Sequence, residues 1–270
     1  MKKKLLSVCL MAGGLVFSAA AVHAEDDDGF AAYREMLDFG GNPAELTEMA
    51  GEELWFEARG PKEASLEECD LGQGPGVIEG AYSQLPRYFP DADQVMDLES
   101  RLLYCMETLQ GLDRDEEAKK AISGGSDYAS DMESLVAYVV AASRGVPINV
   151  PQEHEKEIES YQRGEQIFFH RAGPYDFSCS SCHAVTGQRI RLQDLPNLSE
   201  SEYAQQAYSS WPAYRVSQGA LRSMQWRLRD CFRQQRLPVL KYGSQASIDL
   251  TTYLAVNANG GEMDAPALKR

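Results

Sequence analysis

The chain repeats itself, and this repeat limits the folds that it can adopt. Residues 51–61 match residues 164–174 at an offset of 113. Further landmarks follow in the same order along the chain: Pro86 with Pro212, Tyr88 with Tyr214, Arg101 with Arg227, Cys105 with Cys231, Leu135 with Leu250, Tyr138 with Tyr253, and Gly145 with Gly260. Solenoid repeats are only about 20 to 50 residues long. The pattern therefore predicts two copies of one domain, fused in tandem.

Each copy is predicted to be mainly α-helical. Apolar residues at helical spacing predict a helix over residues 155–171, and similar patterns predict helices over 132–143 and 247–256. Strand signals are sparse. Pro147 and Pro151 interrupt any helix between the copies, so residues 146–151 are the expected linker and the domains are predicted as residues 25–150 and 151–270. The charged, glycine-containing stretch 115–131 is predicted to be a surface loop.

The first 24 residues have the pattern of a cleaved export signal. Three lysines precede an apolar run, and Val22-His23-Ala24 supplies a small-x-small cleavage site. The run is short for a membrane span, and acidic residues follow it at once. We therefore expect a periplasmic protein with no membrane span.

Cys179-Ser-Ser-Cys182-His183 is the attachment signature of haem c. Two thiols three residues apart can each form a thioether to the porphyrin, and the adjacent imidazole can then ligate the iron. A thioredoxin-like dithiol would need a βαβ context, and a zinc site would need a further ligand pair at metal spacing. We therefore predict one covalently attached haem c, carried by the second copy.

The first copy lacks this chemistry, since Leu66 and Asp70 align with the first attaching cysteine and the ligand histidine. Its remaining thiols, Cys69 and Cys105, align with Cys182 and Cys231. If both occupy the corresponding places, they converge where haem would lie, and a disulfide between them is expected in an oxidising compartment. Two separate buried thiols are the alternative.

Cys231 is then left without a cysteine partner, which makes it a candidate reactive thiol in an exported protein. The second axial position of the haem has five candidate residues: Met224, Met263, His154, His170 and Cys231. Met224 is the usual choice for a small electron carrier. His154 and His170 are expected at the surface or in helix packing, with His170 a candidate neighbour of the haem propionates.

Charge is distributed unevenly. Residues 25–151 hold 28 acidic and 9 basic residues, whereas residues 152–270 hold 13 and 14. An acidic half argues against nucleic acid and anionic membranes as partners. Six arginines nevertheless fall within 22 residues of the second copy: Arg215, Arg222, Arg227, Arg229, Arg233 and Arg236. They could form a solvated helix face, pair with haem propionates, or bind a small oxyanion.

The haem motif, followed about fifty residues later by Arg227-x-x-x-Cys231-Phe-Arg-Gln-Gln-Arg in a duplicated exported chain, resembles the SoxA family of sulfur-oxidation cytochromes. The match is closest to its single-haem branch. The resemblance implies a heterodimer with a small cytochrome subunit of the SoxX type. It also implies L-cysteine S-thiosulfotransferase activity, which joins thiosulfate oxidatively to a cysteine of the SoxYZ carrier.

By the same resemblance, Cys231 is the distal haem ligand and the catalytic sulfur, held as a persulfide, and Arg227 binds the substrate. Nearby arginines should depress the pKa of the Cys231 thiol and attract the thiosulfate dianion. Two other functions stay open: an electron-transfer cytochrome with Met224 as distal ligand and no sulfur chemistry, and a haem-bearing scaffold whose acidic copy docks a partner.

Overall fold

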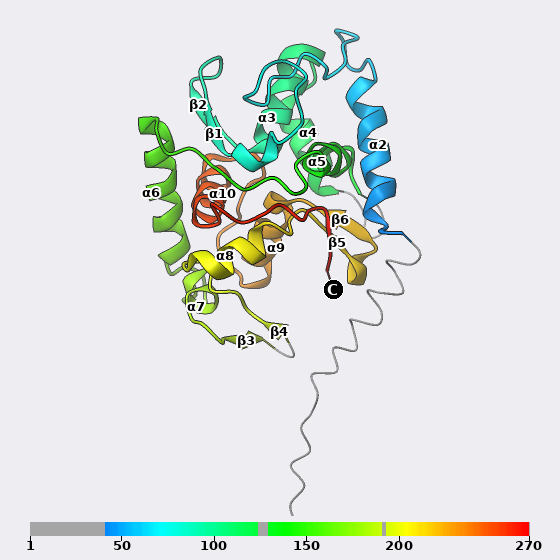
Figure 1. Cartoon of the computed structure of the whole chain (residues 1–270). Helices are drawn as coiled ribbons and strands as arrows, with labels where there is room; N and C mark the ends of the chain where they lie inside the picture. Colours follow the sequence, from blue (N-terminus) through cyan, green and yellow to red (C-terminus); the bar gives the residue numbers. More distant parts are fainter. Residues whose placement is uncertain (1–40, 124–128, 191–192, 270) are drawn as a thin grey trace, which may run out of the picture. The chain divides into compact units, whose positions relative to one another are not determined.

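Two pairs of crossed helices organise the computed structural model, which describes residues 41–123, 129–190 and 193–269. α2 (Ala44–Phe56) packs on α5 (Asp131–Ala141), and α6 (Glu155–Phe169) packs on α10 (Gln245–Asn257) (Figure 1). A Cβ atom at Gly51 would lie 1.9 Å from the Ser134 carbonyl oxygen, and one at Gly164 would lie 2.0 Å from that of Asp249. Glycine is therefore needed at both crossings, and this explains why the two copies share it.

Each half also contains a hairpin followed by a helix. In the first, β1 (Arg87–Phe89) pairs antiparallel with β2 (Gln94–Met96) and leads into α3 (Leu98–Cys105). In the second, β5 (Ala213–Arg215) pairs with β6 (Ala220–Arg222) and leads into α9 (Met224–Gln234). The strands correspond at the offset of 126. The second hairpin is extended by β7 (Ala267–Lys269), parallel to β5, in the order β6-β5-β7.

The mainly helical prediction is confirmed, whereas these short strands were not anticipated. Of the predicted helices, 155–171, 132–143 and 247–256 correspond to α6, α5 and α10. The remaining elements are η1 (Tyr82–Gln84), η2 (Met106–Gln110), α4 (Arg114–Ser123), α7 (Ser180–His183), β3 (Arg189–Ile190), β4 (Gln193–Asp194), α8 (Ser201–Tyr208) and η3 (Val216–Gln218).

The prediction of a surface loop over residues 115–131 was wrong in its first part, because α4 occupies residues 114–123. The Asp113 carboxylate accepts a hydrogen bond from the Glu116 amide at 2.9 Å, and so stabilises the start of the helix. Lys119 and Lys120 form ion pairs one turn along it with Glu116 and Glu117. The charges that indicated a loop therefore support a helix.

The two halves meet through a buried polar network. The Gln225 side chain donates to Asp97 at 2.6 Å and to Ser100 at 3.1 Å. The backbone amide of Gln225 donates to the Glu99 carboxylate at 3.0 Å. Glu99 and Gln225 correspond to each other in the repeat, so the beginnings of α3 and α9 face one another. All these groups are buried. They stabilise the interface only because each finds a partner.

An ion pair also crosses between the halves. The Arg222 guanidinium lies 3.1 Å from the Glu133 carboxylate, and both side chains are almost fully buried. Arg222 therefore supports the fold and is not available as part of an anion site. Gly40 to Arg270 form one compact unit, and the main hydrophobic core contains residues of both halves.

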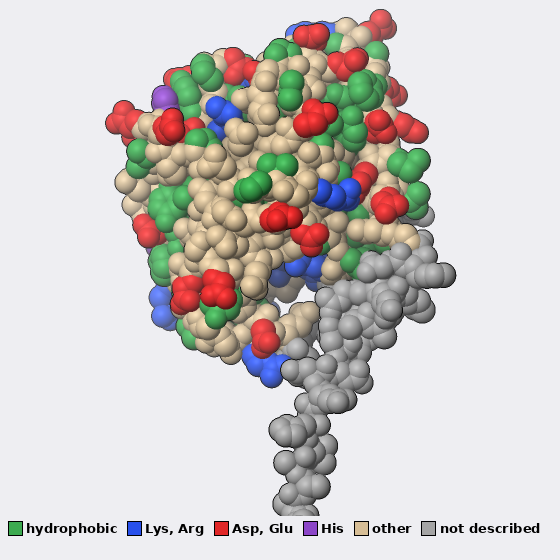
Figure 2. Space-filling model, in the orientation of Figure 1, with side chains coloured by type: hydrophobic (Ala, Val, Ile, Leu, Met, Phe, Trp, Pro, Cys, Tyr) green, Lys and Arg blue, Asp and Glu red, His purple; other side chains and the backbone are tan. Residues whose placement is uncertain are grey.

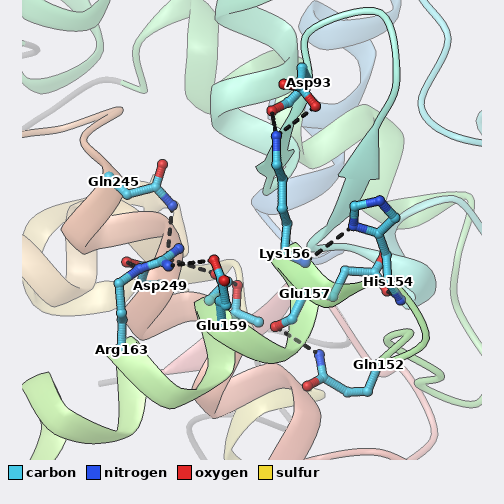
Figure 3. Close-up of polar contacts among 11 residues, drawn as sticks. Asp93, Gln152, His154, Lys156, Glu157, Glu159, Arg163, Gln245 and Asp249 are labelled. Carbon is cyan, nitrogen blue, oxygen red and sulfur yellow. Dashed lines mark hydrogen bonds and ion pairs between the residues drawn. The ribbon is translucent and has the colours of Figure 1, made fainter.

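The start of α6 is fastened to the first half. Lys156 forms an ion pair with Asp93 at 2.6 Å, and the His154 ring stacks on Tyr88 with their centroids 3.7 Å apart. Figure 3 shows Lys156 reaching Asp93, and further along α6 it shows Arg163 meeting Asp249 of α10. The predicted linker, residues 146–151, lies just before this contact. It pairs with a segment near the end of the chain, since the Ile148 amide donates to the Gly261 carbonyl.

Acidic side chains are spread over the face shown in Figure 2, where Lys and Arg are fewer. No helix within the described residues is long and apolar enough to cross a membrane. The predicted signal peptide, residues 1–24, lies outside the described residues.

Candidate functional site

One helical turn carries the haem-attachment motif. α7 begins after Cys179, and the His183 amide donates to the Cys179 carbonyl at 2.9 Å. Cys179 and Cys182 are therefore three residues apart on a helix, a spacing that places both thiols on one face. Both thiols are free and half-buried. Ser178 fixes the start of this turn, since its hydroxyl accepts a hydrogen bond from the Ser181 amide at 3.2 Å.

Hydrogen bonds to the backbone of Pro196 and Leu198 fix the position of His183. Its Nδ1 lies 3.0 Å from the Pro196 carbonyl oxygen, and the Leu198 amide donates to the His183 carbonyl at 2.8 Å. A carbonyl oxygen only accepts, so Nδ1 must carry the proton and Nε2 keeps its lone pair. Burial, with a smaller effect from Arg227, lowers the pKa of His183. The ring is thus neutral and has a nitrogen available for a metal ion.

The loop before this turn packs against the end of α9. Gly173, in the left-handed region at φ 73°, has no room for a side chain, because a Cβ atom would lie 2.5 Å from the Arg236 carbonyl oxygen. A cavity of about 490 Å³ opens here, bounded by α6, α10 and the chain after α9. Its lining includes Cys179, Phe232 and His170. This volume is in the usual range for ligand and cofactor pockets.

Cys231 lies on α9 one helical turn after Arg227, so both project from the same side of the helix. The thiol is close enough to Arg227, Asp230, Arg215 and Cys182 for their charges to affect its pKa. Arg227 also acts on the pKa of His183. The guanidinium of Arg227 therefore lies near both the imidazole and the thiol.

The predicted depression of the Cys231 pKa was wrong for this structure. Burial has the largest effect and raises the pKa of the thiol, although Arg227 and Arg215 act in the opposite direction. Asp230 also raises it and takes part of the arginine charge, since it lies 2.7 Å from Arg233 and 3.5 Å from Arg227. In this structure the effect of burial on the pKa of Cys231 outweighs the opposite effect of the two arginines.

The corresponding place in the first half is filled by protein. Cys69 and Cys105 form a disulfide, the pairing predicted from the repeat. Asp70, which aligns with His183, uses its carboxylate to accept hydrogen bonds from the amides of Gly72 and Gly74. Arg101, which aligns with Arg227, donates to the Asp70 carbonyl at 2.7 Å. These residues are joined to one another and leave the first half without a free thiol or imidazole at these positions.

The residues of the second half fit haem c. Two free thiols, Cys179 and Cys182, lie on one turn just before the His183 imidazole, whose Nδ1 donates to a carbonyl. A third thiol, Cys231, is close enough to affect the pKa of Cys179. The pKa of Cys179 is raised to about 12 by burial, then by Cys231 and Cys182. Two free thiols beside a neutral imidazole are what a covalently attached haem would require. The cavity beside Cys179 is lined by neither His183 nor Cys231.

The structure gives the surroundings of the other four candidates for the second axial position. Met224 begins α9, seven residues before Cys231 and therefore about 10 Å along the helix axis. It is packed in the core, as is Met263. His154 caps the start of α6 and stacks on Tyr88, whereas His170 ends α6 and lines the cavity. The Cys231 thiol is close enough to Cys179 to affect its pKa.

The sequence matches the family described as SoxA/TsdA, cytochrome c domain, once over residues 50–148 and again over residues 163–263. The two matched segments cover most of both halves. The chain belongs to the SoxA/TsdA cytochrome c family. The half that carries the haem motif and the half that lacks it thus match the same family.

Two relatives match this chain over nearly the whole length of both proteins. It is 48% identical to L-cysteine S-thiosulfotransferase subunit SoxA of Hydrogenophilus thermoluteolus over the whole of both chains. It is 32% identical to the subunit of the same name from Hydrogenobacter thermophilus, covering 96% of this chain and 95% of that one. The crystal structure of SoxXA from P. pantotrophus has the same fold, with a TM-score of 0.71 and 23% identity over 89% of this chain and 84% of that chain.

Sequence reasoning missed three contributors to this site. Arg215 was only one of six clustered arginines, Asp230 was not considered, and Pro196 supplies a backbone carbonyl that no motif reveals. The repeat could have identified Arg215, because at the offset of 126 it replaces Phe89, and an arginine in place of a buried aromatic residue is conspicuous.

Proposed function

We propose that this SoxA chain is the catalytic cytochrome subunit of an L-cysteine S-thiosulfotransferase. It would join thiosulfate to a cysteine of a SoxYZ-type carrier, as a heterodimer with a small SoxX-type cytochrome. The observation that carries this proposal is the position of Arg227, which acts on both Cys231 and His183. An anion held by this guanidinium would lie beside the free thiol and the haem-attachment turn.

Cys179 and Cys182 would attach one haem c, with His183 and Cys231 as its axial ligands. Haem, when bound, supplies a one-electron acceptor next to the reacting sulfur. The contribution of the protein is positional. Pro196 holds the imidazole proton, and α9 keeps Cys231 one turn from Arg227. The first half, filled by the Cys69–Cys105 disulfide, would carry no haem.

Arg227 would bind the substrate through its planar fork, which suits the oxygen atoms of a sulfonate group. Its side chain is 30% exposed, so an anion can reach it from solvent. Thiosulfate carries two negative charges, and Arg227 would orient its terminal sulfur toward Cys231. Cys231 would act as the catalytic sulfur and carry the extra sulfur of a persulfide.

The reaction balances as an oxidation followed by a transfer. The outer sulfur of the Cys231 persulfide and the terminal sulfur of the thiosulfate dianion would form a sulfur–sulfur bond and give up two electrons, which would pass singly to c-type cytochrome acceptors. The carrier thiolate would then attack the thiosulfate-derived sulfur of this bond. The carrier would leave with the thiosulfonate group, and the Cys231 persulfide would be regenerated.

Under the same proposal, residues 1–24 would be an export signal and this chemistry would take place in the periplasm. Sulfur oxyanions and c-type cytochrome acceptors would be accessible there, and the compartment would permit the disulfide. The net charge of −15 gives no affinity for nucleic acid.

The decisive experiment measures thiosulfate-dependent reduction of cytochrome c by the haem-loaded heterodimer, with the carrier present. Cys231→Ala should abolish turnover, and Arg227→Gln should raise the KM for thiosulfate. Arg236→Gln is the matched control, because this exposed arginine lies over the Tyr175 ring beyond the end of α9. It removes the same charge and should leave the rate unchanged.

The result that contradicts the proposal is full activity in Cys231→Ala. Cytochrome reduction that requires no thiosulfate and no Cys231 would instead identify an electron-transfer cytochrome without sulfur chemistry. Binding of the carrier with no turnover in the wild type would identify a scaffold.

A further inference from the structure

The second half contains an arginine, Arg215, at a place where the first half holds a phenylalanine. Arg215 is the last residue of β5, half-buried, with its Cα in register with Ala220 of β6 and Lys269 of β7. Strand neighbours on both sides fix the position of its backbone. The corresponding residue at the end of β1 is Phe89.

The first half shows which residue this position faces. The Arg101 guanidinium lies 4.1 Å from the centroid of the Phe89 ring and 5.0 Å from that of Tyr104, and it forms an ion pair with Asp91 at 2.8 Å. Only 4% of the Arg101 side chain is exposed. Arg101 is therefore enclosed by two rings and an acid, and this closed cradle serves packing.

The second half changes each wall of that cradle. At the offset of 126, Phe89 becomes Arg215, Asp91 becomes Ser217, and Tyr104 becomes Asp230. Arg227, in the place of Arg101, has 30% of its side chain exposed. The changes replace both rings, exchange the acid Asp91 for Asp230, and add a second guanidinium at the end of β5. A closed structural cradle has become a more open one that holds two arginines and one acid.

The electrostatic surroundings agree with this placement. The pKa of Arg215 is lowered by burial and then by Arg227, whereas Asp230 and Cys231 act to raise it. Arg215 is thus near both Arg227 and the candidate catalytic thiol. The buried Asp230 carboxylate is shared with Arg233 and Gln234, at 2.7 and 2.6 Å. Two guanidinium groups close to the same thiol make this part of the site favourable for a dianion.

We propose that Arg215 is a second substrate-binding residue, which with Arg227 grips the sulfonate end of a tetrahedral sulfur dianion. This inference rests on the proposed function and extends it. A single guanidinium fork engages only two of the three sulfonate oxygens, so Arg227 alone would orient thiosulfate in part. Two guanidinium forks on separate elements, β5 and α9, fix the three sulfonate oxygens, so that the remaining sulfur points to Cys231.

The test uses the haem-loaded heterodimer and four variants. Arg215→Gln and Arg215→Phe remove the charge, and the second restores the residue that the first half uses. Arg215→Lys keeps the charge but loses the fork. Arg236→Gln is the control for loss of one surface charge. Calorimetric titration with thiosulfate, without carrier, measures binding directly, and steady-state assays separate KM from kcat.

We expect Arg215→Gln and Arg215→Phe to weaken thiosulfate binding and raise KM by roughly 10- to 100-fold, the usual effect of losing hydrogen bonds to a charged group. Arg215→Lys should lie between these variants and the wild type. Haem content and the visible spectrum should not change, and the fall in kcat should be much smaller than the rise in KM.

Unchanged binding and KM in both charge-removing variants would overturn the role of Arg215, and normal turnover in the same experiment would leave the proposed function intact. A changed haem potential with unchanged KM would also overturn it, since Arg215 would then pair with a haem propionate. Failure of the proposed function has a different signature: the wild-type heterodimer neither binds nor oxidises thiosulfate.

Discussion

Removal of the disulfide in the first half should cost the protein about 4 kcal/mol of stability. Cys69 and Cys105 are 36 residues apart, and the chain-entropy relation gives about 4 kcal/mol at 25 °C for a loop of that length. For a chain of this size that loss lowers the unfolding midpoint by about 8 to 16 °C. Both sulfur atoms are buried, so alanine is the substitution that leaves no unpaired polar group in the core.

The assay is urea unfolding of the haem-loaded protein, followed by circular dichroism, for the wild type and for Cys69→Ala combined with Cys105→Ala. The haem spectrum should be the same in both proteins, because the bond lies in the half without the attachment motif. Intact-mass measurement of the wild type supplies the control, since the bond removes two hydrogens. A stability difference below about 1 kcal/mol with the bond present would refute the view that it replaces haem as a restraint on this half.

Two further predictions concern the interior. Gly164→Ala should destabilise the protein by about 3 kcal/mol or more in the same urea assay, because the new methyl group would lie 2.0 Å from the Asp249 carbonyl oxygen. Gly187→Ala is the control: its methyl group would have nothing within 4 Å, and it should cost only about 1 kcal/mol. Burial and the neighbouring Asp97 raise the pKa of Glu99 to about 8, so the folded state holds a proton that the unfolded state releases above its ordinary pKa of 4.5. The free energy of unfolding should therefore fall as pH rises from about 4.5 to 8, and Glu99→Gln should reduce this slope; an unchanged slope would refute the assignment.

The repeat made much of the fold predictable. Matched glycines at 51 and 164 mark the two helix crossings. α6 ends two residues before its predicted end, and α10 begins two residues earlier and ends one residue later than predicted. The strands were missed because three-residue strands such as β5 are too short to show an alternating pattern. α4 was missed because its charges stabilise a helix through capping and i,i+3 pairs, which composition alone does not distinguish from a loop.

The site was predictable as far as its chemistry is local. The spacing of Cys179, Cys182 and His183 follows from one helical turn, and the repeat pointed to the disulfide. Burial is a tertiary property, and it reversed the expected direction of the Cys231 pKa shift. The clustered arginines also have different surroundings, which the sequence does not show. Arg222 forms a buried ion pair with Glu133, whereas Arg215 lies near the Cys231 thiol.

The proposed function depends on the position of the Cys231 sulfur relative to the haem iron, and the low-temperature EPR spectrum of the ferric haem measures it most directly. The wild type and Met224→Leu should both show a low-spin haem with thiolate ligation, and Cys231→Ala should lose that signal. A wild-type spectrum that persists in Cys231→Ala and disappears in Met224→Leu would contradict it, because the thiol would then lie away from the haem iron.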